Sequence, residues 1–442
     1  MSEILFGLFG LSTLLALTWL FSNNKRAVDW KLVGTGVLLQ IVFAAFVLKT
    51  QIGSAIFEGM GNLFVTLINF TNEGSKMILG GFADQDKYGF VFIFHALPTV
   101  IFFAAFMAVL YHLGIMQWIV KMMAMAITKV MRVSGAETTS VCASVFIGQT
   151  EAPLTVRPYI NKMTDSELLT MMIGGMAHIA GGVMAVYIGM LAGTNTELQQ
   201  MFAKHFLAAS IMAAPATLLI AKILIPETGT PLTRGTISIH VEKESTNIID
   251  AAAGGASDGM KLAINIAAML LAFVALIAMV NAVIGWVGDW NFSGYQSINM
   301  MLNHGIAAGA TPIKLNLGLM LGYVLAPIAW VIGIEWKDAV IAGGLIGQKI
   351  VLNEFIAYLQ LAQTPIGNAV GAISENSRLI LTYALCGFAN FASIAIQIGG
   401  IGSLAPERRS DLARFGMRAV LGGTIATLMT ATIAGVMLNL GN

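Results

Sequence analysis

Charged residues are scarce in this sequence. Asp, Glu, Lys and Arg make up 11% of the 442 residues, whereas hydrophobic residues make up 57%. Soluble proteins usually carry about 25% charged residues, so this chain has too few charges to cover a soluble surface. The deficit excludes a soluble enzyme and a nucleic-acid-binding protein. Only two cysteines are present, Cys142 and Cys386, and both lie in apolar stretches, which excludes a disulfide scaffold and a zinc cluster.

Catalytic and phosphate-binding signatures are also missing. The sequence has no His-Glu-x-x-His motif, no Gly-x-Ser-x-Gly elbow and no phosphate-binding Gly-Lys-Ser/Thr loop. Five of the six histidines, His95, His112, His205, His240 and His304, show no metal-ligand spacing with cysteine or acidic residues. These absences predict a protein that is not an enzyme and holds no cofactor or resident metal. They also argue against an ATP-driven pump, which leaves coupling to an ion gradient or a passive channel.

Long apolar runs fill most of the chain. About 20 apolar residues cross the hydrocarbon core of a bilayer, and the apolar total would suffice for roughly ten to twelve crossings. Eight runs are close to this length, at 4–22, 33–49, 91–111, 169–192, 206–225, 262–288, 379–399 and 417–438. The first run has no Lys or Arg before it, so we expect a retained helix and not a cleaved signal peptide.

Shorter apolar runs lie between these spans and are interrupted by Gly, Pro or charge, at 62–70, 116–130, 141–160, 316–334 and 338–361. Short, interrupted segments at corresponding places in two halves indicate a transporter with broken helices. A faint internal similarity supports this: the pattern at 175–180 recurs at 387–392. We therefore predict an all-α polytopic membrane protein with about eight transmembrane helices, two re-entrant helical hairpins and an inverted repeat.

Basic residues set the expected orientation. Lys25, Arg26 and Lys31 lie between the first two spans, and four arginines lie at 408–418, just before or at the start of the last span. By the positive-inside rule these loops face the cytoplasm and both termini face outside. The expected location is the cell inner (plasma) membrane.

Two acidic residues stand in interrupted apolar segments, where a charge normally faces a cavity or a partner. Glu151 lies in Gly148-Gln149-Thr150-Glu151-Ala152-Pro153-Leu154, which has the glycine and proline of a hairpin tip. Gln149, Thr150 and Glu151 present an amide, a hydroxyl and a carboxylate, a set suited to a polar heterocycle. The alternative is a structural ion pair of Glu151 with Arg157 or Lys162.

The second acid, Glu354, follows Asn353 in another interrupted run, and a carboxylate there suits ligand hydroxyls. The alternative is an ion pair with Lys349. Asn390 and Ser393 are three residues apart and share a helix face; they serve equally well as ligand contacts or as polar contacts between helices. His178 is either a proton-carrying group or a neutral imidazole bonded to a backbone carbonyl.

At these residues the sequence resembles the concentrative nucleoside transporter family. Four strings carry the resemblance in order along nearly the whole chain: 148–154, Asn353-Glu354-Phe355 with Ala357-Tyr358, Ala384 to Phe391, and Gly402 to Arg409. The resemblance implies a homotrimer. Each protomer would hold a scaffold and a mobile transport domain, in which two opposed hairpins and two unwound helices meet at the substrate.

The resemblance also implies roles for individual residues. The nucleobase would contact Gln149, Thr150, Glu151, Val183, Leu262 and Phe388. The ribose hydroxyls would contact Glu354, Asn390 and Ser393. Expected substrates are nucleosides such as uridine, cytidine and adenosine. The expected partners are these nucleosides, the lipid bilayer and two further copies of the chain, without nucleic acid.

The chain differs from the sodium-coupled members at two positions. Those members usually have Asn where this chain has Ser144, and Ser where it has His178. Together with carbonyls at the positions of Ile147 and Ile179, those side chains form the family's sodium site. Because imidazole is a poor sodium ligand, we favour protons (H+) over Na+ as the coupling ion, carried by Glu151, Glu354 or His178. Sodium bound by Ser144, water and carbonyls is the alternative.

The domain organisation expected from these features begins with three scaffold helices at 1–111. A first transport-domain half follows at 112–225, with an interfacial helix, hairpin 1 and helices 4 and 5, and then a cytoplasmic loop at 226–261. Scaffold helix 6 occupies 262–300, and the second half, with hairpin 2 and broken helices 7 and 8, occupies 301–442. The expected function is secondary active import of nucleosides. The alternatives are a passive gated channel for small polar solutes and a nucleoside-sensing receptor, although no segment is long enough for a signalling domain.

Overall fold

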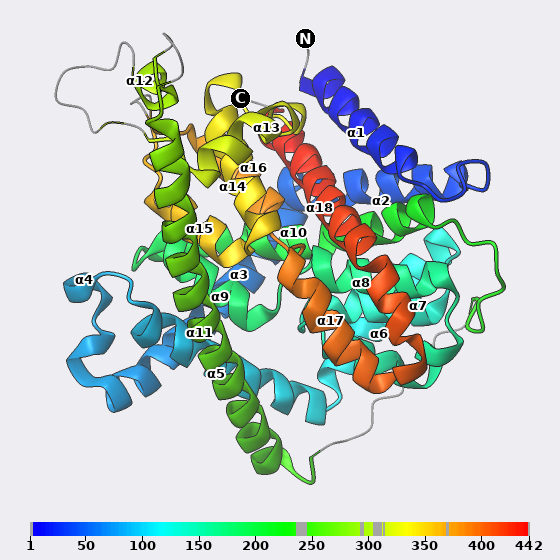
Figure 1. Cartoon of the computed structure of the whole chain (residues 1–442). Helices are drawn as coiled ribbons and strands as arrows, with labels where there is room; N and C mark the ends of the chain where they lie inside the picture. Colours follow the sequence, from blue (N-terminus) through cyan, green and yellow to red (C-terminus); the bar gives the residue numbers. More distant parts are fainter. Residues whose placement is uncertain are drawn as a thin grey trace.

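The fold is helical throughout its described part. The structure is a computed structural model that describes residues 3–235, 245–291, 296–303, 312, 314–367 and 371–440 (Figure 1). No strand occurs among these residues. The long continuous helices are α1 (Glu3–Leu20), α2 (Trp30–Lys49), α3 (Gln51–Leu79), α5 (Phe92–His112), α6 (Ile115–Met131), α10 (Thr196–Leu224), α11 (Ile248–Gly288), α13 (Leu317–Val331) and α18 (Arg409–Asn439).

Short helical pieces complete the inventory. The connecting turns are η1 (Gly80–Ala83), α4 (Gln85–Tyr88), α12 (Ile298–Leu302), η3 (Trp336–Asp338) and η4 (Pro406–Arg408). The pieces that form hairpins and broken helices are α7 (Gly135–Ser144), η2 (Ala152–Lys162), α8 (Asp165–Ala177), α9 (Gly181–Ala192), α14 (Ala339–Val351), α15 (Glu354–Gln363), α16 (Glu375–Ala384) and α17 (Phe391–Leu404).

Seven helical segments in the described residues are long and apolar enough to cross a bilayer: Glu3–Leu20, Trp30–Lys49, Phe92–His112, Asp165–Ala192, Thr196–Leu224, Ile248–Gly288 and Pro406–Asn439. The eighth predicted span, at 379–399, is not one helix, because 385–390 separate α16 from α17. Counted with this interrupted unit, the segments make the eight crossings that the apolar runs predict. A multi-pass membrane protein is confirmed.

The order of elements repeats along the chain. A long helix (α6 or α13) is followed by a two-armed hairpin (α7–η2 or α14–α15), a broken helix (α8–α9 or α16–α17) and a long continuous helix (α10 or α18). Each broken helix contains one of the two weakly similar sequence stretches, 175–180 in the first and 387–392 in the second. The last helix, α18, runs without interruption from Arg409 to Asn439, so the expected break in helix 8 is wrong.

The base of hairpin 1 lies at the end of the molecule that carries the basic loops. Lys222 at the end of α10 pairs with Glu137 in α7 at 2.8 Å. Asn23, next to the basic 25–31 segment, donates its backbone N–H to the Leu224 carbonyl at 3.0 Å. Arg408 contacts Asp165 at the start of α8 at 3.2 Å. Both clusters of basic residues therefore lie at one end, as a single cytoplasmic face requires.

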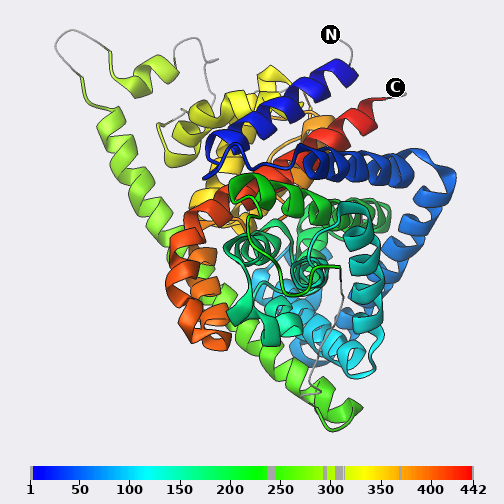
Figure 2. The same cartoon turned by 90° about the vertical axis from the view of Figure 1, so that its right-hand side faces the viewer.

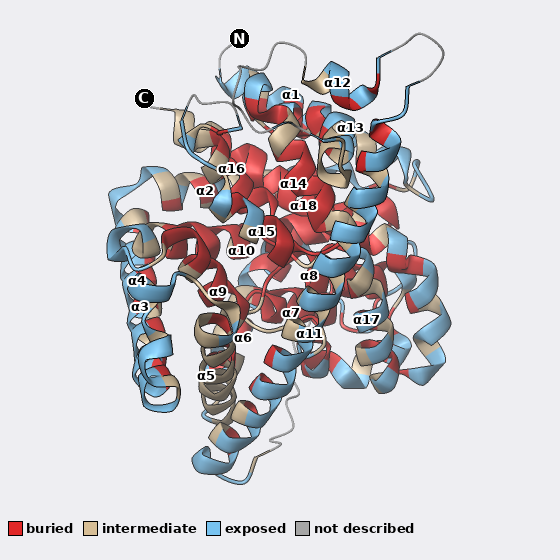
Figure 3. Cartoon of the chain, turned by 60° about the vertical axis from the view of Figure 1, so that its left-hand side comes forward, coloured by how far each residue is buried: buried red, intermediate tan, exposed pale blue. Residues whose placement is uncertain are grey.

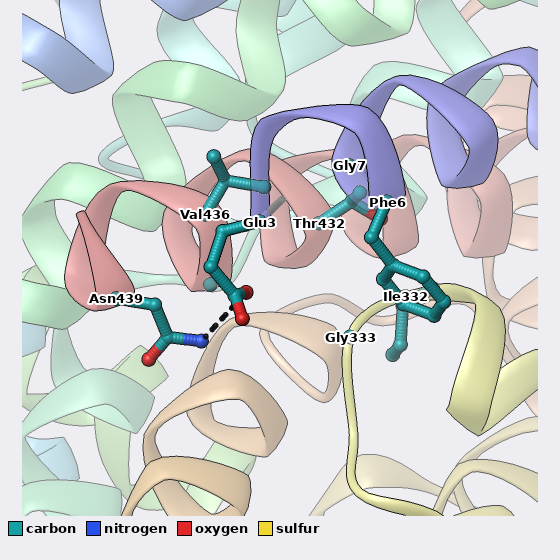
Figure 4. A pocket seen from close by; sticks show the side chains of 9 residues that line it. Glu3, Phe6, Gly7, Ile332, Gly333, Thr432, Val436 and Asn439 are labelled. Carbon is teal, nitrogen blue, oxygen red and sulfur yellow. Dashed lines mark hydrogen bonds between the residues drawn. The ribbon is translucent and has the colours of Figure 1, made fainter. Parts of the chain in front are cut away.

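The base of hairpin 2 lies at the opposite end, beside both chain termini (Figure 1). Asn439 donates to the Glu3 carboxylate at 3.3 Å. Figure 4 shows this contact next to Ile332 and Gly333, which precede hairpin 2, around a cavity of about 10 Å³. The two hairpins therefore enter the molecule from opposite ends, as expected for an inverted repeat.

Burial divides the helices into a core and a periphery. In an apolar 18-residue stretch of α10, 94% of the residues are buried, whereas in the corresponding stretch of α11 only 6% are buried. Figure 3 shows buried residues concentrated in α8, α14, α16 and α18, whereas α11 is mostly exposed, and in the turned view it runs along the edge of the molecule (Figure 2). The repeat elements thus form the core, and α11 lies against it through α5.

The predicted cytoplasmic loop at 226–261 is shorter than expected. Helix α11 already begins at Ile248, because Asn247 caps it by accepting the Asp250 N–H at 2.9 Å. Its first turns have few large apolar residues, so a hydropathy pattern misses them. They are held by close packing: a Cβ at Gly255 would lie 2.6 Å from the Ala108 Cβ of α5. Residues 236–244 of the predicted loop lie outside the described residues.

Candidate functional site

The two broken helices cross at their breaks. The Phe388 N–H, in the second break, donates to the His178 carbonyl, in the first, at 3.3 Å. Gly387 permits this approach, because a Cβ there would lie 2.8 Å from the Met176 carbonyl oxygen. The tip of hairpin 1 joins the crossing, since the Phe146 carbonyl accepts the Gly181 N–H at 3.1 Å. Helix ends, with their unsatisfied backbone groups, therefore meet inside the protein.

Glu354 stands at the first position of α15, at the tip of hairpin 2, and its side chain is buried. One carboxylate oxygen accepts from the Tyr187 hydroxyl of α9 at 3.0 Å. The other accepts from the Asn390 amide of the second break, also at 3.0 Å. The helix N-terminus favours the negative charge. Glu354, on α15, is therefore held by donors from two other elements, one in each half of the repeat.

The alternative ion pair of Glu354 with Lys349 is not formed. The Lys349 ammonium is fully buried and donates to the Ala384 carbonyl, at the end of α16, and to the Thr427 hydroxyl, each at 2.9 Å. A cation at the C-terminal end of a helix fragment is favoured by the helix dipole. Lys349 thus stabilises the second break and leaves Glu354 to neutral donors.

A polar face of α17 joins the two hairpin tips. Asn390 caps the helix by accepting the Ser393 N–H at 2.9 Å. The Ser393 hydroxyl accepts from the Gln149 amide, at the tip of hairpin 1, at 3.1 Å. Asn390 and Ser393 therefore form polar contacts between separate elements, which was one of the two predicted roles. Their side chains also face the crossing, as contact with a ligand, the other predicted role, requires.

The Gln149, Thr150 and Glu151 side chains do not form the common edge that the sequence predicts. Gln149 is directed to Ser393, whereas Thr150 packs against α17, where a Cβ at Gly400 would lie 2.5 Å from the Thr150 methyl. Glu151 is exposed and lines a cavity. The cause is the tight turn at the tip, in which the Ala152 N–H bonds to the Gly148 carbonyl at 3.1 Å, so that successive side chains diverge.

A cavity of about 700 Å³ opens between α5, α11 and the tip of hairpin 1. Four predicted site residues line it: Ile147, Glu151, Val183 and Leu262. Cavities of this size hold small organic ligands. Phe388 does not line the cavity and lies half-buried in the second break.

The predicted ion-coupling residues lie around the first break, and two of their side chains, His178 and Ser144, bond to backbone carbonyls. His178 is buried, and its Nδ1 lies 2.7 Å from the Gly174 carbonyl. Because that carbonyl can only accept, Nδ1 carries a hydrogen. Ser144 donates to the Ser140 carbonyl at 3.0 Å, and Ile179 is fully buried. Within the described residues, no group of three or more His, Cys, Asp or Glu side chains could hold a metal ion.

Three residues at the crossing were not predicted as members of the site. Tyr187 and Gln397 reach it from α9 and α17, and Lys349, considered only as an ion-pair partner, stabilises the second break. Gln397 could have been recognised from the sequence as a member of the site, because it lies four residues after Ser393 on one face of an apolar helix. No sequence feature marks Tyr187, since an aromatic residue in an apolar span usually serves packing.

Three models of known protein families match this chain and assign it to a family. Its residues 205–435 match the family model described as the C-terminus of Na+ dependent nucleoside transporters, and residues 9–82 match the N-terminus of the same group. Residues 93–194 match a family model described as nucleoside recognition. The chain belongs to the concentrative nucleoside transporter family. It is therefore a cation-coupled secondary active transporter of nucleosides, and not an enzyme.

Relatives match the chain from end to end. An uncharacterised transporter of Haemophilus influenzae is 42% identical, with 99% of both chains covered. The nucleoside permease NupC of Helicobacter pylori is 38% identical, with 99% of this chain and 98% of NupC covered. The rat sodium/nucleoside cotransporter 1 is 37% identical over 98% of this chain and 64% of its own length.

A solved structure has the same fold. CNTnw in an inward-facing substrate-bound state superposes with a TM-score of 0.87 at 40% sequence identity, and 99% of both chains is covered. The concentrative nucleoside transporter fold, with its opposed hairpins and broken helices, is therefore the fold of this chain.

Proposed function

We propose that this transporter imports nucleosides such as uridine, cytidine and adenosine by binding them at the crossing of the two broken helices. The ribose hydroxyls contact Glu354, Asn390 and Ser393. The nucleobase contacts Gln149, Thr150, Glu151, Val183, Leu262 and Phe388. The observation that carries the proposal is the buried Glu354 carboxylate, which accepts hydrogen bonds from neutral donors on both oxygens. Ribose hydroxyls are donors of the same kind.

Substrate binding exchanges hydrogen bonds inside this site. In the structure, Asn390 bonds to Glu354, and Gln149 bonds to Ser393. A ribose hydroxyl takes over the acceptor position on Glu354 that Asn390 occupies, while the Ser393 hydroxyl, which can both donate and accept, contacts the ribose and keeps its bond to Gln149. A ligand without hydroxyl groups cannot make these hydrogen bonds, so it lacks the roughly 0.5–1.5 kcal/mol that each one contributes to binding. The site therefore selects nucleosides over free nucleobases.

Protons are the proposed coupling ion. Sodium requires several oxygen ligands, whereas His178 supplies a ring nitrogen at this place. Glu151, Glu354 and His178 are the candidate proton carriers. Sodium, held by Ser144, water and the carbonyls of Ile147 and Ile179, is the competing assignment.

Uptake into proteoliposomes under imposed gradients tests this assignment. We expect an acid-outside pH gradient in sodium-free buffer to drive labelled uridine uptake, and a sodium gradient at equal pH to add nothing. Uptake driven by the sodium gradient alone would contradict proton coupling. A protonophore is the matched control, since it should abolish the first uptake.

A homotrimer is the proposed assembly in the plasma membrane. Helix α11 exposes large apolar side chains, including Leu271, Val283 and Trp286, on a face that must meet lipid or protein. The buried repeat elements then act as the mobile domain and α11 belongs to the scaffold. The mass of the complex in mild detergent, three times that of one chain, is the expected result.

A further inference from the structure

Gln397 is a fully buried amide that contacts the tip of hairpin 1 without belonging to the proposed substrate contacts. It lies on α17, one turn after Ser393. Its Nε2 lies 2.9 Å from the Met172 carbonyl of α8 and 3.2 Å from the Gln149 Oε1. One NH₂ group thus connects α17, α8 and hairpin 1.

The Met172 carbonyl decides how both amides are oriented. A backbone carbonyl only accepts hydrogen bonds, so the Gln397 group that faces it must be the NH₂. The same NH₂ faces Gln149, so the Gln149 atom next to it must be the carbonyl oxygen. The Gln149 NH₂ is then directed to Ser393, 3.1 Å away. This orientation follows from the backbone and does not depend on how amide atoms are assigned.

The pair of amides sits in a slot that Gly175 leaves open. A Cβ at Gly175 would lie 2.7 Å from the Gln397 Nε2 and 2.9 Å from the Gln149 Cβ. Both glutamine side chains are buried, with exposures of 0% for Gln397 and 8% for Gln149. Water therefore has little access with which to compensate a rotated amide.

We propose that Gln397 is a positioning residue for specificity, which forces Gln149 to present a hydrogen-bond donor to the nucleobase. This inference rests on the proposed function, in which Gln149 contacts the base and Ser393 the ribose. Since one Gln149 hydrogen is directed to the ribose side, the other meets the base acceptor nearest the sugar. Pyrimidines present O2 and purines N3 on that edge. Gln149 therefore selects for an acceptor shared by all natural nucleosides.

The test compares uridine with 2-thiouridine, in which a weakly accepting sulfur replaces O2. Inhibition constants are measured against labelled uridine uptake in proteoliposomes. The unmodified transporter is expected to prefer uridine by about 3- to 10-fold, the value of one hydrogen bond. Gln397→Met frees the Gln149 amide to rotate, so the ratio of the two constants should fall to within about twofold of unity.

Controls separate positioning from general damage. Gln40→Met removes another fully buried glutamine, which donates to the Met212 carbonyl at 3.0 Å and to the Thr430 hydroxyl at 3.3 Å and not to a proposed substrate contact, and it should keep the unmodified ratio. Gln149→Met should lose the ratio, and adding Gln397→Met to it should change nothing further. Gln397→Glu, which has the same shape but cannot donate to both acceptors, should also lose the ratio and replaces Gln397→Met if that variant does not fold.

An unchanged ratio in both Gln397 variants would overturn the inference, as would an equal loss in Gln40→Met. If Gln149→Met itself keeps the ratio and the uridine affinity, the nucleobase assignment of Gln149 fails instead. The two failures are therefore distinguishable.

Discussion

Glu354 is a buried acid whose two oxygens are held by a tyrosine and an asparagine from different elements, each at 3.0 Å. Such a carboxylate offers acceptor positions on both oxygens, and its neighbours are neutral groups that a substrate can replace. A lysine or arginine partner would bind more strongly and would be harder to displace. The neutral surroundings of Glu354 therefore suit a ligand that must be bound and then released.

Glu354→Gln is expected to reduce uridine uptake to about 1% or less of the unmodified rate while the protein still folds, because an amide offers one acceptor oxygen where the carboxylate offers two. Tyr187→Phe removes one donor and keeps Asn390, so uptake should fall only about 3- to 10-fold. Labelled uridine uptake with matched amounts of protein checks both variants. Equal activity of Glu354→Gln and unmodified protein would contradict the ribose assignment.

The residues of the site were predictable from the sequence to different degrees. Glu354, Asn390 and Ser393 were recognisable because polar groups are rare in apolar runs, and the structure brings them together. Glu151 was expected at depth beside Gln149, but it faces the cavity and is exposed. The direction of a side chain at a turn depends on backbone dihedrals, which residue types do not determine.

The base of hairpin 1 is an ionic network that the sequence did not reveal. Lys222 pairs with Glu137 at 2.8 Å and with Glu227 at 3.3 Å, and it donates to Ser166 at 3.0 Å. Lys222 and Glu137 are nearly completely buried. Lys222 and Glu137 lie far apart along the chain, so no local sequence pattern predicts that they pair. The network fixes hairpin 1 to α8 and α10.

Lys222→Met should destabilise the protein by about 3–5 kcal/mol, because it leaves buried acids without their cation. Lys261→Met is the matched control: Lys261 contacts Asp258 at 3.0 Å, but both side chains are more than 70% exposed. Thermal unfolding in detergent should show a lower midpoint for the first variant and no change for the second. Equal midpoints would show that the network contributes nothing to stability.

The crossing of the broken helices depends on the absence of a side chain at Gly387. Gly387→Ala would place a Cβ 2.8 Å from the Met176 carbonyl oxygen, and such overpacking costs about 1–3 kcal/mol. We expect lower uridine uptake together with a lower unfolding temperature. Gly399→Ala on α17 is the control, since a Cβ added there would have no atom within 4 Å, and it should transport normally. Normal uptake by Gly387→Ala would contradict the close approach.

The whole molecule combines a buried repeat with an exposed outer helix. The number of crossings and the inverted repeat were predictable, because hydropathy and interrupted runs report on them directly. The start of α11 at Ile248 and the unbroken α18 were not. Both depend on packing between distant segments: small residues of α11 fit against α5, and α18 contacts α8, α10 and α16.

Accumulation of uridine in proteoliposomes decides whether this transporter carries out concentrative uptake that depends on Glu354. With an acid-outside pH gradient and no sodium, internal uridine should rise above the external concentration, and Glu354→Gln should abolish this rise. Uridine that only equilibrates across the membrane, or accumulation that persists in Glu354→Gln, would contradict this expectation.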